Sequence, residues 1–408
     1  MTKGQLRKYA RVVVTMGINL EPGQDVIIHI NVDQHLFAEF LVEECYKKGA
    51  RKVTVEFADD KITRHNYRYQ SEETLSEVPE WVESKAKYSC EKLPCMIYVD
   101  SSDPAAFDGL DMSKVMRARQ KTMKVLKKYR DQKENKYQWV IVALPSKAWA
   151  AQIFPDDNIQ HAYSKLEDAI IKCTRIDGKD PVSDWEKHIE YLDNYSKKMN
   201  DYHFECLEYA SSNGTKLRIR LNRYHVWLSA RETTLLNRPF TANMPTEEVF
   251  TMPDRDGVDG VVVSTKPLSY NGNLIENFKI YFEKGIAVKV EAERGQEILE
   301  EIINTDEGSK HLGEVALVPY DSPINQTGIL FYNTLFDENA CCHLALGAGF
   351  ANNMQDYEKY TLEELKARGL NDSINHVDFM IGSSDLTITG FTYDGKAVEV
   401  FKNGNWNI

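Results

Sequence analysis

The sequence predicts an α/β N-terminal domain followed by a β-rich α+β domain. Strands and helices alternate through the first half of the chain, whereas short strands dominate the second half. At about 150 residues per domain, 408 residues correspond to two or three domains. With only 22 glycines and 13 prolines, long flexible linkers are not expected. We therefore expect an α/β domain over residues 1–205 and a β-rich domain over residues 206–408.

The first half opens with an amphipathic helix, because its short apolar stretch runs directly into Glu21 and Pro22 without a signal-peptide cleavage site. A β-rich run, a helical segment ending at Gly49 and a second run then follow. This strand–helix–strand order predicts a parallel pair. The expected strands are residues 26–32, 52–58, 96–100 and 139–144, and the later helices are residues 161–175 and 183–200.

The second half has mostly antiparallel connections, with a hairpin signal at residues 393–396 and one short helix at residues 296–304. The expected strands are residues 216–221, 225–230, 258–265, 278–283, 287–291, 314–318, 386–392 and 397–401.

Composition excludes some functions. A net charge of −12 argues against a dedicated nucleic-acid binder, and the basic residues between 114 and 136 are interpreted as a solvated helix face. No apolar window is long enough to span a membrane. Seven cysteines without CxxC spacing favour reduced thiols in the cytoplasm.

Several acids and histidines of the second half have the right chemistry for a metal site. His376 and Asp378 are two apart on an expected strand and therefore share a face. Glu314 enters an apolar run, where a carboxylate must be exposed, paired or bound to a cation. Adjacent acids Glu247 and Glu248 face opposite ways on an extended segment. His343 is expected on a short helix ending at a glycine, where a core histidine is the commoner outcome.

Taken together, three carboxylates and two imidazoles from separate segments are the ligand chemistry of a two-metal hydrolytic site. Each residue alone is more often structural, and spacing does not select these five from the other acids and histidines. The five residues are Glu248, Glu314, His343, His376 and Asp378.

Five multi-residue blocks identify which acids and histidines to select. They are NMPTEEVFT at 243–251, GEVALV at 313–318, FDENACCHLALG at 336–347, LNDSINHVDFMIG at 370–382 and NGNW at 403–406. With these blocks in family order, the chain resembles the thermophilic aminopeptidase family (M29 metallopeptidases) over nearly its whole length.

The resemblance implies that the five residues are ligands of two divalent ions, with zinc, cobalt, manganese or magnesium as candidates. It also implies that residues 206–408 are the catalytic, metal-binding domain of a homodimer that removes the N-terminal residue of peptides. From composition we expect a cytoplasmic protein without a membrane or nucleic-acid partner. We expect metal-activated water as the nucleophile and Glu247 as the general base. No cofactor-binding residues beyond the ligands are expected.

One position departs from the family. A tyrosine is usual seven residues after the histidine at 343, but this chain has Phe350, which can neither coordinate a metal nor donate a hydrogen bond. Tyr357 or Tyr360 would have to fill the gap. Two alternatives therefore stay open: a family member with weakened activity that mainly binds peptide or metal, and an unrelated two-metal phosphoesterase. The lack of a glycine-rich phosphate loop weighs against the second.

Overall fold

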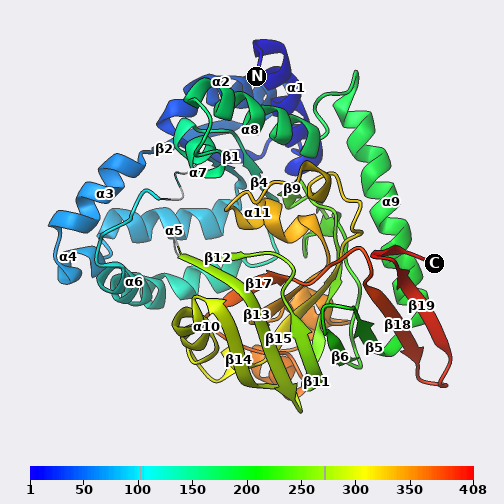
Figure 1. The fold of residues 1–408 in the computed structure, drawn as a ribbon. Helices are drawn as coiled ribbons and strands as arrows, with labels where there is room; N and C mark the ends of the chain where they lie inside the picture. Colours follow the sequence, from blue (N-terminus) through cyan, green and yellow to red (C-terminus); the bar gives the residue numbers. More distant parts are fainter. Residues whose placement is uncertain (102, 104, 271–272) are drawn as a thin grey trace. The chain divides into compact units, whose positions relative to one another are not determined.

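The chain forms two compact units in the computed structural model, which describes residues 1–101, 103, 105–270 and 273–408 (Figure 1). The first unit is Met1–Lys187 with Arg231–Met244, and the second is His188–Ala230 with Pro245–Ile408. The expected domain boundary at residue 205 falls within strand β5 (Phe204–Ala210) of the second unit. The mixed α/β and β-rich architecture expected from the sequence is confirmed.

The first unit is built on a parallel sheet with the strand order β2-β1-β3-β4-β9. Its inner strands are apolar and buried because helices cover a parallel sheet. The predicted strand–helix–strand unit is confirmed, with β1 and β2 parallel on either side of α2. The strands are β1 Asp25–Asn31, β2 Lys52–Ala58, β3 Cys95–Asp100, β4 Trp139–Ala143 and β9 Asn243–Met244, with a separate β7 Glu232–Thr233 and β8 Pro239–Phe240 ribbon.

The helices of this unit begin at side-chain caps in several cases, such as the Thr2 capping box of α1. The basic residues after residue 114 lie mostly on the solvated surface of α6, and several pair with Glu72 and Glu83, as the charge pattern predicts. The helices are α1 Lys3–Val12, α2 His35–Lys47, α3 Asp60–Tyr69, α4 Glu72–Ser76, α5 Glu80–Lys92, α6 Met112–Lys133, α7 Lys147–Ile153, α8 Ile159–Cys173 and α9 Pro181–Tyr202, which continues into the second unit.

The second unit contains a large antiparallel sheet with the order β12-β13-β11-β6-β5-β18-β19-β20, and β14 pairs with β13. The expected hairpin is confirmed, with β18 and β19 joined by a turn in which Gly395 adopts a positive φ of 82°. The strands are β6 Lys216–Leu221, β11 Pro253–Val263, β12 Leu268–Tyr270, β13 Asn273–Glu283, β14 Ile286–Arg294, β18 Thr387–Thr392, β19 Ala397–Lys402 and β20 Asn405–Trp406.

A smaller antiparallel sheet of the same unit, with the order β10-β15-β16-β17, carries most of the candidate site. Its two central strands are buried along their whole length. Gly313 allows a close backbone approach, because a Cβ there would lie 2.2 Å from the Ala348 carbonyl oxygen. The strands are β10 Val249–Thr251, β15 Leu312–Leu317, β16 His343–Gly347 and β17 His376–Met380.

Two local predictions are wrong. His343 begins strand β16 and not a short helix, because residues 343–347 pair with strands on both sides. Residues 225–230 form isolated bridges at His225 and Leu228 and no strand. The helix near residue 296 is confirmed as α10 Gln296–Ile303, but α11 Thr334–Asp337 and α12 Leu362–Ala367 were not expected. In the described part of the chain, no helix combines the length and apolarity needed to cross a membrane.

Candidate metal centre

Strand register brings four of the five expected ligands, Glu314, His343, His376 and Asp378, to one face of the small sheet. Ala345 in the central strand β16 pairs with Glu314 on one side and Asp378 on the other. Directly opposed residues project to the same face, so these two acids flank a methyl group. His343 and His376 lie two residues before Ala345 and Asp378 and share that face. The small residue between the acids leaves room for their carboxylates to converge.

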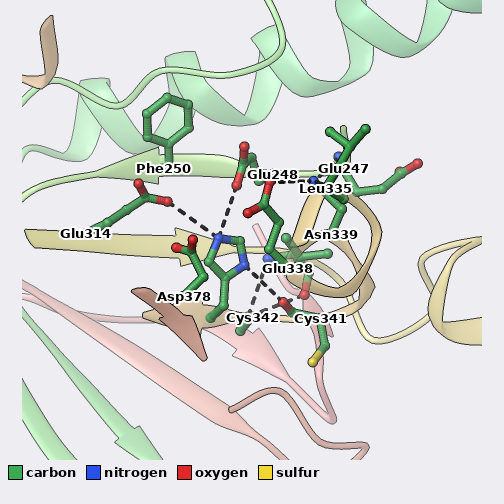
Figure 2. A network of polar contacts seen from close by, with 12 residues as sticks. Glu247, Glu248, Phe250, Glu314, Leu335, Glu338, Asn339, Cys341, Cys342 and Asp378 are labelled. Atoms are coloured by element: carbon green, nitrogen blue, oxygen red, sulfur yellow. Dashed lines mark hydrogen bonds and ion pairs between the residues drawn. The ribbon is translucent and has the colours of Figure 1, made fainter. Parts of the chain in front are cut away.

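Glu248 joins this group from the end of the segment that leads into β10. Its Oε2 lies 3.2 Å from the Nε2 atom of His343, and Glu314 Oε1 lies 3.4 Å from the same nitrogen (Figure 2). The other Glu314 oxygen, Oε2, lies 3.6 Å from His376 Nε2, which is also 3.3 Å from Asp378 Oδ1. Glu314 is therefore shared between the two imidazoles.

These contacts define two overlapping sets of ligand atoms that lie within 4.8 Å of one another. One set is Glu248, Glu314 and His343, and the other is Glu314, His376 and Asp378. Carboxylate oxygens and imidazole nitrogens in this number and spacing suit divalent metals. All five expected residues are thus brought together, in the second unit.

The other nitrogen of each imidazole, Nδ1, lies within hydrogen-bond distance of a backbone carbonyl oxygen. His343 Nδ1 lies 3.3 Å from the Cys341 carbonyl oxygen, and His376 Nδ1 lies 2.7 Å from that of Ala348. A carbonyl oxygen can only accept, so each Nδ1 carries a proton. In a neutral imidazole, Nε2 then has no proton and its lone pair faces carboxylate oxygens. Lone pairs that face one another repel, so a cation between them would stabilise this arrangement. The residues present therefore fit a metal centre.

The pKa shifts of these side chains indicate that the group is stabilised by positive charge. Burial opposes protonation of His343, but the Glu248 and Glu314 carboxylates outweigh it and raise its pKa well above the usual value. Burial likewise opposes protonation of His376, but Asp378 and Glu314 raise its pKa to about 9. Burial raises the pKa of Glu314 above its usual range. Without a metal, protons would supply part of the charge that these side chains require.

Glu338 is a further acid at this site that sequence reasoning missed. It lines a small pocket, of about 20 Å³, together with Asp378 and Met380. That volume is enough for about one water-sized group. Burial, and then the Asp378 and Glu248 carboxylates, raise the pKa of Glu338 well above its usual value. A signal was available, because Glu338 lies inside the FDENA block of the resemblance.

Glu247, the expected general base, has different neighbours from Glu248. Its carboxylate Oε2 lies 3.6 Å from Nε2 of His188 on α9, and the residue is only 4% exposed. Its backbone N–H donates to Asn339 Oδ1 over 2.7 Å. The two adjacent glutamates therefore contact different groups, as expected for neighbours on an extended segment.

Phe350 lies beside the candidate ligand group. Its ring centroid is 4.8 Å from that of His376 and 6.4 Å from that of Phe250. Tyr357 and Tyr360 instead pack against a hydrophobic cluster of buried residues. The cluster is Met252, Met354, Leu365 and Leu370.

Comparisons with known proteins agree with this geometry. The sequence model of the family described as "Thermophilic metalloprotease (M29)" matches residues 2–406. The chain is similar to Aminopeptidase AmpS of Bacillus subtilis (strain 168), at 44% identity over 98% of both chains. It is also similar to Aminopeptidase PepS of Streptococcus thermophilus, at 41% identity over 100% of this chain and 98% of that protein.

The solved structure of wild-type AmpT from Thermus thermophilus superposes with a TM-score of 0.91, at 35% identity and with both chains covered completely. Sequence and fold therefore agree over the full length, and the predicted family is confirmed. The chain belongs to the thermophilic metalloprotease (M29) family and is a metal-dependent aminopeptidase.

Proposed function

We propose that the five side chains of this metal-dependent aminopeptidase hold two divalent cations and that hydrolysis of the first peptide bond takes place beside them. The observation that carries the proposal is the pair of Nε2 atoms that face carboxylate oxygens at 3.2–3.6 Å while each Nδ1 is committed to a backbone carbonyl. Glu314 is the shared carboxylate, because its two oxygens face different imidazoles. Zinc or cobalt suits the imidazoles best, and manganese or magnesium suits the carboxylates.

Bound divalent ions at such a site lower the pKa of a coordinated water toward about 7 and polarise the scissile carbonyl. The side chains of this chain then have separate tasks. The buried ligand group excludes bulk water and fixes where the scissile carbonyl must lie. The pocket beside Glu338 and Asp378 has the size, and in its carboxyl oxygens the hydrogen-bond acceptors, to hold the free α-ammonium of a peptide. Cleavage would then be limited to the first residue, because an internal peptide bond has no ammonium beside it.

A carboxylate outside the ligand set must accept the proton of the water and return it to the leaving amine. Glu247 and Glu338 are the two candidates. Glu338 lines the same pocket as the ligand Asp378, whereas the Glu247 carboxylate is close to His188. These contacts favour Glu338 as the proton acceptor over Glu247, the residue that we expected from the sequence.

Matched isosteric variants separate the two candidates. E338Q should lower kcat by about 10²–10⁴ with the metal content unchanged, while E247Q should stay within a few-fold of the wild type. A large loss in E247Q with normal E338Q would return the role to Glu247.

Release of free leucine from a leucine peptide tests the metal-centre proposal itself. The assay is run on chelator-treated protein to which zinc, cobalt, manganese or magnesium is restored. Release should depend on added metal and should be lost in Glu248→Ala and in His376→Ala. Undiminished activity in either variant would contradict the ligand assignment. No release with any metal would favour a protein that only binds peptide or metal, and hydrolysis of a phosphoester would favour the phosphoesterase alternative.

We further propose that the protein is a cytoplasmic homodimer. Its cysteines are not joined in disulfides in the part of the chain that the structure describes, which is compatible with a reducing compartment. Light scattering behind a sizing column measures the mass directly, and a monomeric mass would contradict the dimer. Fractionation of the source cells tests the compartment.

A further inference from the structure

Phe350 is unusual among the phenylalanines of the second unit. Its side chain is 43% exposed, whereas Phe278, Phe336 and Phe379 are at most 1% exposed. A bound apolar group that covers this ring would remove apolar surface from water, which is favourable. The ring lies beside the proposed metal ligand His376, where the substrate must bind.

Phe350 belongs to an aromatic pair that borders the metal-binding group. Its ring lies 4.8 Å from the ring of His376, which is the most exposed of the imidazoles and acids in the group, with 23% of its side chain accessible. Phe250 meets Phe350 edge to face, with an angle of 79° between the rings. Phe250 lies two residues after Glu248 and pairs with Ala316, which is two residues after Glu314, so its ring projects to the same face of the small sheet as Glu314. The two rings therefore border the ligand group, Phe350 at His376 and Phe250 near Glu248 and Glu314.

We propose that Phe350 and Phe250 form the surface that contacts the side chain of the substrate's first residue, and that this surface makes the enzyme prefer apolar first residues. The inference rests on the proposed metal centre, because the scissile carbonyl must lie at the ligands. The carbon that bears the first side chain is bonded directly to that carbonyl carbon. The side chain therefore starts within two bonds of the reacting centre and reaches the nearest exposed surface.

The chemistry of the pair determines the preference. Both rings are hydrocarbon, and a phenylalanine at position 350 has no hydroxyl to ligate a metal or to pair with a polar group. A leucine or phenylalanine side chain would cover the exposed ring and gain hydrophobic contact. A glutamate side chain would lose hydration without gaining a partner on these rings. Alanine is too small to gain much from the surface.

The test is the ratio of kcat/KM for leucine p-nitroanilide to that for alanine p-nitroanilide, measured with wild type, F350A and F350Y. F350A should lower this ratio about 10- to 30-fold, mainly through KM for the leucine substrate, because one or two hydrophobic groups lose their contact. F350Y keeps the ring and should stay within about threefold of the wild-type ratio. The control I286A truncates an apolar residue of β14 with a similar exposure of 41% and should leave the ratio unchanged.

Two further measurements do not depend on the ratio of the two substrates. The bound metal content of F350A should equal that of the wild type, because Phe350 is not a ligand. Inhibition by free L-leucine should weaken about 10-fold in F350A, whereas inhibition by glycine should not change. Equal losses for both substrates, or an unchanged ratio, would overturn the inference. Loss of metal from F350A would also overturn it, because the ring would then act through His376. A wild type that binds no metal at this group would instead refute the metal centre.

Discussion

Replacing Glu314 with glutamine should remove most of the stabilisation that added metal gives this protein. Glu314 is the one side chain that contacts both imidazoles within the expected ligand set, and only 6% of it is exposed. The amide keeps the volume but removes one negative charge and one strong donor to a cation. Since weakening an outer partner of a ligand already costs about 10- to 100-fold in metal affinity, loss of a shared ligand should cost at least about 100-fold.

The thermodynamic consequence can be worked out for one metal concentration. At 100 times the wild-type Kd, metal stabilises the folded state by about 2.7 kcal/mol, and a 100-fold weaker site gives about 0.4 kcal/mol. For a cooperative unit of about 200 residues, these energies correspond to Tm shifts of about 5–11 °C and about 1–2 °C.

The assay is thermal unfolding of chelator-treated wild type and Glu314→Gln, followed by circular dichroism with and without metal. The control Glu363→Gln changes an acid of α12 that is 82% exposed, and it should keep the wild-type shift. A near-ultraviolet spectrum like that of the wild type shows that the metal-free variant is folded. An undiminished metal-dependent shift in folded Glu314→Gln would refute the assignment of Glu314 as a shared ligand.

Two further predictions concern the supporting structure. Burial lowers the pKa of His225 to about 4, below the usual value of about 6.5. The neutral ring therefore contributes stability above pH 6.5 that is lost as the pH falls toward 4. Between pH 7 and 5, the free energy of unfolding measured with denaturant should fall by about 2 kcal/mol less in His225→Gln than in wild type. Asn371 donates from Nδ2 to the carbonyls of Gly308 and Gly347 over 2.8 and 2.6 Å. Asn371→Ala leaves both buried carbonyls without this donor and should cost about 2–4 kcal/mol in the same assay, and a loss below about 0.5 kcal/mol would contradict it.

The local sequence pattern was sufficient to predict strands whose apolar residues form a clear run or alternate with polar ones. Strand β2 begins and ends where its apolar and β-branched run predicts, and β6 alternates between buried and exposed residues. It was not sufficient for β16, since a short, wholly buried run has no period that separates a strand from a helix. Residues 225–230 contain the apolar run Val226 to Leu228, which is typical of a strand, yet the structure forms only isolated bridges there. Pairing partners distant in sequence decide such cases.

The same limit applies to the site. His376 and Asp378 can be placed on one face from their spacing alone. The convergence of Glu314 with them depends on its register against Ala345, which no local pattern contains. Glu338 was missed for this reason, because its importance comes from a pocket that it shares with a residue 40 positions away, Asp378. The family blocks identified the five expected ligands nevertheless, since these blocks contain the residues that the fold brings together.

The most direct test of the metal centre is anomalous X-ray scattering from crystals of metal-loaded protein, recorded on both sides of the absorption edge of the bound metal. Two peaks are expected, one among Glu248, Glu314 and His343 and the other among Glu314, His376 and Asp378. Peaks only elsewhere in the molecule, with none at this group, would contradict the central claim.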